Sequence, residues 1–201
     1  TPTWRPYPYQ FPFFLMEGFE LEEFNKWLES ENIFFFHSAH TVNFPEYFPE
    51  NLSRFVFIDH PKHPLFDISL FMHEVDILIN DYSTTSTDFA LFKKPQMFFM
   101  QDYEYYKSEK GFVEDYKEFL PGKEIKEYTQ LTKTIKDYLI NPQSYVDNYE
   151  NNIQILLEKY YNTSLTNSSE SFMKVITKII DNPHKIELND LTNLKPNSVN
   201  N

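Results

Sequence analysis

The sequence predicts an α/β fold: a Rossmann-like parallel sheet with helices on both faces. Apolar runs of strand length recur roughly every 20 residues, with helical or loop segments between them; they lie at 33–36, 55–58, 75–79 and 96–100. Runs that are apolar throughout are typical of parallel strands covered on both faces. Composition agrees, because 41% hydrophobic and 18% aromatic residues in a chain of 201 are enough for a packed core.

Helices are expected between and after these strands. Residues 1–19 are rich in proline and aromatic residues and are predicted to be irregular. A helix is expected at 20–31, where apolar residues recur at helical spacing: Leu21, Phe24, Trp27 and Leu28. A short helix is expected at 66–74. The pattern is helical from Tyr128 onward, with helices predicted at 131–140, 144–161 and 169–180 and a break at Pro142.

These elements suggest how the chain is divided. We expect a Rossmann-like lobe at 1–140, helices that pack on it at 141–181, and a polar, flexible tail at 182–201. The chain opens without a methionine. We therefore expect that the front of a longer protein is missing from it.

Composition excludes or disfavours several kinds of site and partner. The absence of cysteine excludes disulfides and thiolate metal sites, and the net charge of −12 disfavours nucleic acid and anionic membranes as partners. The three glycines form neither GxGxxG nor the P-loop pattern. No metal site is expected at His60 and His63, because they have no partner at metal-ligand spacing. No other cofactor is expected. A phosphorylated ligand must then be held by hydroxyl groups and helix N-termini.

The segment 75–90 combines a strand, a hydroxyl-rich turn and a helix start. The strand ends at Asn80 and Asp81, five hydroxyl residues follow at 83–87, and Asp88 begins a helical pattern. The first N–H groups of a helix have no partner inside it, and Ser and Thr add donors at the same place. We interpret this turn as the cradle of a diphosphate. A structural alternative stays open, in which the hydroxyls cap the helix, Asp81 closes the turn and Asp88 favours the helix dipole.

Polar side chains follow each predicted strand. If the strands are parallel neighbours, these groups share one edge of the sheet, where ligands of such folds bind. The groups are His37, Ser38 and His40; Asp59, His60 and His63; Asn80, Asp81 and the hydroxyl run; and Gln101 and Asp102. Two histidines, His37 and His40, follow the first predicted strand and are close enough to take the same part in the site.

Several motifs together resemble the CDP-glycerol glycerophosphotransferase family, which includes the teichoic-acid polymerases and related capsule polymerases. In that family a strand runs into an Asp-Tyr-Ser turn, followed by Asp-Phe-Ala, Lys-Pro, a Tyr-rich helix, Gly-Phe and Pro-Gly. This chain carries the series at 75–90, Lys94-Pro95, Asp102–Tyr106, Gly111-Phe112 and Pro121-Gly122, after an upstream Pro2-Thr3-Trp4-Arg5. The resemblance covers roughly residues 1–140. Two positions depart from it: Thr87 replaces an apolar residue, and Thr41 follows the family histidine, which we place at His40.

The resemblance implies a GT-B architecture in which this chain is the C-terminal, nucleotide-binding lobe. It implies transfer of a polyol phosphate from a CDP-activated donor to a growing polymer, with an acceptor hydroxyl attacking the β-phosphorus and CMP leaving. His40 is then the catalytic candidate, and the residues expected to bind the donor are Arg5, His40, Asp81, Ser83, Thr84, Thr85 and Asp88. Because the family's base histidine comes from the other lobe, this chain alone is expected to bind CDP donors weakly and to transfer nothing.

The resemblance also implies partners and a location. The partners are the CDP-activated donor, the polymer acceptor and the N-terminal lobe of the same protein, with no nucleic acid. The full-length protein is expected in the cytoplasm, at the inner face of the cell membrane. Any membrane contact is expected through other regions, since nothing basic and amphipathic occurs here.

Two alternative functions stay open. One is a GT-B sialyltransferase that uses CMP-sialic acid, for which His60-Pro61 offers the His-Pro pair. The other is a non-catalytic domain that binds a nucleotide or a polymer. The downstream Gly111-Phe112 and Pro121-Gly122 favour polyol-phosphate transfer over the sialyltransferase.

Overall fold

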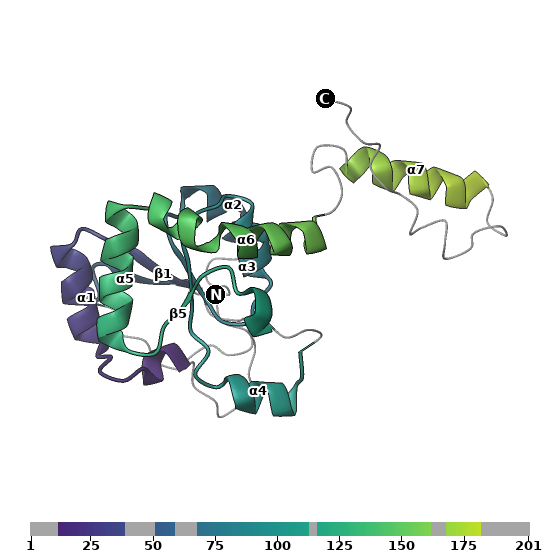
Figure 1. Ribbon diagram of the computed structural model, residues 1–201. Coiled ribbons are helices and arrows are strands. Elements are labelled where there is room, and N and C mark those ends of the chain that lie inside the picture. Colours follow the sequence, from purple (N-terminus) through teal and green to yellow (C-terminus); the bar gives the residue numbers. More distant parts are fainter. Residues whose placement is uncertain (1–11, 39–50, 59–67, 113–115, 162–167, 182–201) are drawn as a thin grey trace. The chain divides into compact units, whose positions relative to one another are not determined.

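The computed structural model describes residues 12–38, 51–58, 68–112, 116–161 and 168–181 (Figure 1). The chain divides into two compact units, residues 1–156 and 157–201, and every described strand belongs to the first. Residues 141–156 thus belong to the same unit as the strands. No helix in the described part of the chain is long and apolar enough to cross a membrane.

Parallel strands form the centre of the first unit. β1 (Phe35–Ser38) pairs with β2 (Phe55–Ile58), while β3 (Leu78–Asn80), β4 (Gln96–Phe98) and β5 (Lys123–Glu124) form a second sheet in that order. All of these pairs are parallel, as the alternation of apolar runs predicts. The α/β class is confirmed. The described strands nevertheless form two sheets rather than one, because β1 is not hydrogen-bonded to β3.

β1 begins two residues later than predicted because the residues before it end a helix. Helix α1 (Leu21–Ser30) is followed by Asn32 in the left-handed conformation, with φ 55°. The N–H groups of Asn32 and Ile33 donate to carbonyls of the last helical turn at 3.2 and 2.9 Å, which satisfies the helix C-terminus. The N–H group of Ile33 is thus bonded to the end of the helix rather than to a neighbouring strand. The strand shifts forward and includes His37 and Ser38, which the sequence places after it.

The remaining elements follow the predicted order. β2 coincides with its predicted run, whereas β3 begins only after Asp76, a residue type that is depleted in strands. β5 was not predicted, because its two residues are polar and carry no apolar signal. Besides α1, the helices are η1 (Pro12–Leu15), α2 (Ile68–Phe71), η2 (Met72–Glu74), α3 (Thr85–Ala90), α4 (Tyr103–Glu109), η3 (Tyr116–Phe119), α5 (Tyr128–Ile140), α6 (Gln143–Tyr160) and α7 (Ser168–Asp181).

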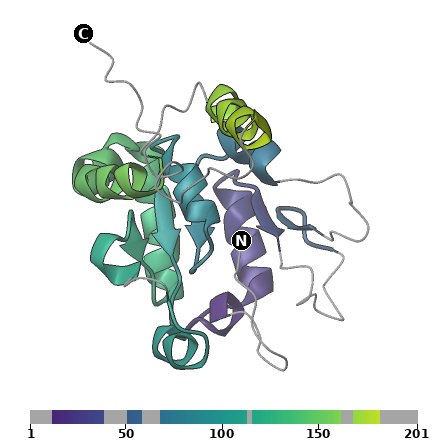
Figure 2. The same cartoon turned by 90° about the vertical axis from the view of Figure 1, so that its right-hand side faces the viewer.

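An aromatic core joins α1 to the first sheet. Phe24 on α1 is fully buried, and its ring lies 5.3 Å from that of Phe35 and 6.2 Å from that of Phe55. Asn25, the next residue, accepts the backbone N–H groups of Arg54 and Phe55 at 2.9 and 3.1 Å. These bonds hold the start of β2 against the helix. Figure 2 shows the molecule after a 90° turn, in which α6 (green) is seen nearly along its axis.

β4 is the most enclosed strand, and α3 is attached to it. All three residues of β4 are fully buried. The hydroxyl of Ser86 on α3 donates to Oε1 of Gln96 at 2.8 Å, and Nε2 of Gln96 donates to the Ser86 carbonyl at 3.2 Å. Two hydrogen bonds between fully buried groups define the position of the short helix against the strand.

The Pro-Gly pair at 121–122 is also a packing element of β4. The Gly122 backbone approaches the strand so closely that a Cβ there would lie 2.3 Å from the Gln96 carbonyl oxygen. The hydroxyl of Tyr145 on α6 donates to the Pro121 carbonyl at 2.5 Å, and the Tyr145 ring is fully buried. Glycine is therefore required here by the close approach of two backbone segments.

Candidate functional site

The turn between β3 and α3 is built by the side chains that precede it. Nδ2 of Asn80 donates to the Ser83 carbonyl at 2.8 Å, and Oδ1 of Asp81 accepts the Ser83 N–H at 3.1 Å. Asn80 and Asp81 are both buried. Asp81 therefore closes the turn through an Asx-type bond, which is the structural role expected for it as an alternative to ligand contact. Its carboxylate therefore holds the backbone of the turn at Ser83.

The run of hydroxyl residues divides into two parts. Ser83 Oγ lies 3.0 Å from Thr85 Oγ1 and also accepts the Thr85 N–H at 3.4 Å, so these two side chains form one hydroxyl pair. Thr84 is exposed and occupies the N-cap position of α3 without a side-chain capping bond. Ser86, in contrast, is fully buried against Gln96. Residues 83–85 thus present the hydroxyl groups, whereas Ser86 belongs to the core.

The backbone N–H groups of the turn offer fewer donors to an anion than the sequence suggests. The N–H groups of Ser86 and Thr87 donate to the Ser83 and Thr84 carbonyls at 3.2 and 2.9 Å, so they are engaged within the turn. Helix α3 has only six residues, so few aligned peptide dipoles act at its start. Asp88 lies exposed in its first turn. Side-chain hydroxyls are therefore the main donors that this turn offers to an anion.

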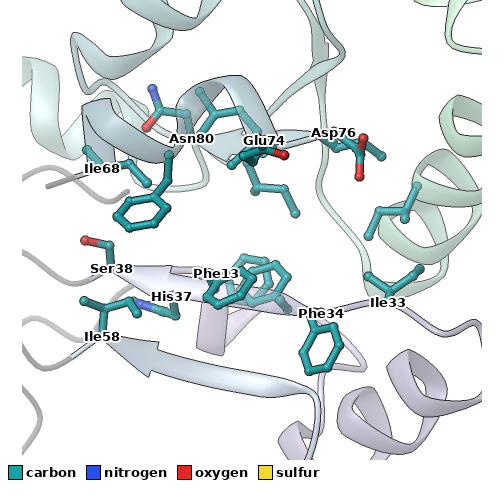
Figure 3. Close-up of a pocket in the computed structure, with 18 of the residues that line it drawn as sticks. Phe13, Ile33, Phe34, His37, Ser38, Ile58, Ile68, Glu74, Asp76 and Asn80 are labelled. Atoms are coloured by element: carbon teal, nitrogen blue, oxygen red, sulfur yellow. The ribbon is translucent and has the colours of Figure 1, made fainter. Parts of the chain in front are cut away.

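A cavity of about 620 Å³ lies between β1 and β3 (Figure 3). Ser38, Asn80 and Asp81 line it where β1 and β3 end, and Glu31, Asn32, Glu74 and Asp76 also line it. Figure 3 shows Ser38 and Asn80 toward one end and Asp76 toward the other. The rest is mostly apolar, with side chains such as Phe13, Ile33, Phe35, Ile135 and Leu139. The ends of β1 and β3 thus meet at one cavity, as the parallel arrangement predicts. Asp102, after β4, instead accepts a hydrogen bond from Tyr82.

His37 is buried in β1 and also lines the cavity. Its ring stacks on Phe14 at 5.1 Å with an interplanar angle of 4°. Burial lowers the pKa of His37 from 6.5 to about 3. The imidazole is therefore neutral near pH 7, and it fits a packing role better than that of a proton donor. Arg5 and His40, together with His60, Pro61 and His63, lie outside the described residues.

Acid should destabilise the first unit through His37. Between pH 6.5 and about 3 the unfolded chain carries a proton on this residue that the folded chain does not. Stability from this source is therefore complete above pH 6.5 and falls as the pH decreases. At pH 5 the loss should be about 2 kcal/mol. Urea unfolding of the wild type and His37→Phe at pH 7.5 and 5 measures it; an equal acid loss in both proteins would contradict the assignment.

Sequence reasoning also missed how the turn is supported. Tyr82, in the middle of the turn, is buried, and its hydroxyl donates to Oδ1 of Asp102 at 2.9 Å. Tyr103, Tyr106 and Phe112 were the available signal in the sequence, because their rings pack around that of Tyr82. The described residues contain no cluster of acidic or histidine side chains arranged to hold a metal ion.

Comparison with known proteins adds relatives of stated activity. A family model described as CDP-Glycerol:Poly(glycerophosphate) glycerophosphotransferase matches residues 1–178. Teichoic acid poly(ribitol-phosphate) polymerase of Bacillus spizizenii is 30% identical over 141 residues, which cover 70% of this chain and 22% of that protein. Teichoic acid glycerol-phosphate primase of Bacillus subtilis is 27% identical over 122 residues, covering 61% and 29%. The chain thus spans less than a third of these relatives.

Solved structures of a wall teichoic acid polymerase, TagF, share the fold. One aligns with a TM-score of 0.66 and 25% identity over 92% of this chain and 43% of that chain. A TagF variant soaked with CDPG aligns with a TM-score of 0.63 at 24% identity, over 91% and 43%. The predicted resemblance and the GT-B-like lobe are confirmed. The relatives named above are polymerases or primases of teichoic acid, and none of them is a sialyltransferase.

Proposed function

The chain belongs to the CDP-glycerol:poly(glycerophosphate) glycerophosphotransferase family, and on that basis we propose that it supplies the lobe that binds a CDP-activated polyol donor. The polyol phosphate of this donor is transferred to a growing wall or capsule polymer. The observation that carries the proposal is the turn at 81–85. Its backbone is held from within by Asn80 and Asp81. Its hydroxyls at 83–85 lie between a parallel strand and a helix start, the position at which α/β folds bind ligands.

Phosphoryl transfer of this kind depends on positioning and on neutralising charge. The acceptor hydroxyl oxygen forms a bond to the β-phosphorus while the bond from that phosphorus to the CMP oxygen breaks. The hydroxyls of Thr84 and Thr85 donate to non-bridging phosphate oxygens. Arg5 provides a planar guanidinium for the same group, and His40 donates a proton toward the departing phosphate. The proton of the acceptor hydroxyl passes to a base in the N-terminal lobe.

Removing the hydroxyls at the turn should weaken CDP binding. We expect the double variant Thr84→Ala/Thr85→Ala to bind CDP about tenfold more weakly than the wild-type chain, because two donors to the diphosphate are lost. A titration followed by the ³¹P signals of CDP measures this directly, even for weak binding. Thr129→Ala is the matched control, since Thr129 is an exposed threonine in the first turn of α5. Equal CDP affinity in the double variant and the wild type would refute the proposal.

The same chain should bind the donor without turning it over. Incubation of the 201-residue chain with CDP-glycerol and a polymer acceptor is expected to release no CMP, because the base belongs to the N-terminal lobe. Adding the rest of the protein should restore CMP release.

We also propose that the full-length protein works in the cytoplasm at the inner face of the cell membrane. Its acceptor is a polymer that grows there. The net charge of −12 on this chain favours membrane contact through other regions. Cell fractionation tests this: the full-length protein should sediment with membranes, while the 201-residue chain should remain in the supernatant.

A further inference from the structure

The side chain of Tyr82 is enclosed by three other aromatic rings. Its ring centroid lies 4.7 Å from that of Tyr106 and 5.1 Å from that of Phe112. Phe112 in turn stacks on Tyr103 at 5.1 Å and on Tyr106 at 5.3 Å. We call these four residues the aromatic box. Its members come from the turn after β3, from α4 and from the Gly-Phe pair, so the box joins three separate segments beside the site.

The Tyr82 hydroxyl donates a hydrogen bond to a carboxylate that is not part of the aromatic box. It donates to Oδ1 of Asp102 at 2.9 Å. Asp102 stands at the N-cap position of α4, but its side chain does not cap that helix. A hydrogen bond to a carboxylate is stronger than one between neutral groups. The bond therefore ties the turn after β3 to the segment after β4, and these are neighbouring strands of one sheet.

This bond restrains the residues that the proposed function uses. Tyr82 lies between Asp81, which closes the turn, and Ser83, which begins the hydroxyl pair with Thr85. A shift of the backbone at residue 82 would disturb both the ring contacts of Tyr82 and its hydrogen bond to Asp102. The helix that follows the turn is held by the hydrogen bonds between Ser86 and Gln96. The turn is thus anchored at residue 82 and again at residue 86.

We propose that the Tyr82–Asp102 hydrogen bond is a positioning device that holds the hydroxyls of residues 83–85 where they receive the second phosphate of a nucleoside diphosphate. The inference rests on the proposed function and assigns positioning roles to Tyr82 and Asp102, rather than contact with the ligand. Contacts to two linked phosphates require donors in a preset geometry, whereas one phosphate adapts to a looser turn. Losing the bond therefore lowers affinity for CDP much more than affinity for CMP.

The test compares CDP and CMP binding to the wild-type chain, Tyr82→Phe and Asp102→Asn. Tyr82→Phe keeps the ring in the box and removes only the donor, so CDP affinity should fall about five- to tenfold while CMP affinity changes less than about twofold. Asp102→Asn retains an acceptor oxygen and should bind CDP within about threefold of the wild type. Tyr138→Phe is the matched control, because it also removes the hydroxyl of a buried tyrosine, which is hydrogen-bonded to the Tyr149 side chain. It should lower the melting temperature and leave the CDP-to-CMP ratio unchanged.

The outcomes separate the inference from the proposed function. If the wild type binds no CDP, or binds CDP no better than CMP, the proposed function fails and the inference fails with it. If the wild type prefers CDP and Tyr82→Phe retains that preference, only the inference is overturned. It is also overturned if Tyr138→Phe loses the preference as much as Tyr82→Phe does, since the loss would then reflect a general loss of stability. A loss confined to Tyr82→Phe, with Asp102→Asn close to the wild type, supports it.

Discussion

Gly122→Ala should reduce the free energy of unfolding by about 3 kcal/mol, the upper part of the range for forcing an atom into a packed interior. The new Cβ would lie 2.3 Å from the carbonyl oxygen of Gln96, 2.9 Å from its carbonyl carbon and 3.0 Å from Cε2 of Phe98. Two of these atoms are backbone. The strand that carries them is fully buried and paired on both edges, so it cannot move away. Urea unfolding of the variant and the wild type measures the loss.

Gly111→Ala provides the contrast for this prediction. Gly111 has φ +71°, but a Cβ there would meet no atom within 4 Å. Its cost is therefore only that of placing alanine in the left-handed conformation, about 1 kcal/mol. If both variants lost the same stability, close approach to β4 would not be the reason for glycine at 122. The comparison separates a steric requirement from a conformational one.

Gln96→Leu should cost about 2 to 3 kcal/mol, because it leaves the buried Ser86 hydroxyl without its acceptor. Leucine fills a similar volume, so a cavity contributes little to the loss. Gln96 and Ser86 are both fully buried, and they exchange hydrogen bonds at 2.8 and 3.2 Å. Gln143→Leu, on an exposed glutamine at the start of α6, should change stability by less than about 0.5 kcal/mol.

A double-mutant cycle tests whether the two side chains act as a pair. Ser86→Ala alone removes the donor and leaves Oε1 of Gln96 unmatched, which should cost about 1 to 2 kcal/mol. In the double variant Gln96→Leu/Ser86→Ala both polar partners are absent, so the loss should be smaller than the sum of the single losses. Strict additivity would show that the two residues contribute independently and that α3 is held to β4 by other contacts.

Local patterns in the sequence were sufficient for the class of fold and for the structure of the turn after β3. Apolar runs with helical segments between them predict parallel strands because each strand is covered on both faces, and β2 agrees with its run residue for residue. The hydroxyl turn is equally local: Asn80, Asp81 and residues 83–85 are neighbours in the chain, so their bonds form within a few residues. The motifs at 75–122 also sufficed to identify the family.

Those local patterns could not predict contacts between segments that are far apart in the sequence. Nothing near Ser86 distinguishes it from Thr85, yet Gln96 draws one hydroxyl into the core while the other faces the turn. His37 and Asp102 were grouped with the site as polar residues at strand ends. Packing on Phe14 makes the first a neutral core side chain, and the hydroxyl of Tyr82 makes the second an anchor.

The pairing of the strands and the requirement for glycine at position 122 also depend on contacts between distant segments. A strand's own residues make it a strand, but its neighbours depend on which backbones come within hydrogen-bonding distance. β1 and β3 therefore border a cavity although both runs look alike in the sequence. Gly122 is required by the carbonyl of a residue 26 positions earlier in the chain. Burial and close approach arise only when segments far apart in the chain are packed together, and for that reason they carry no local signature.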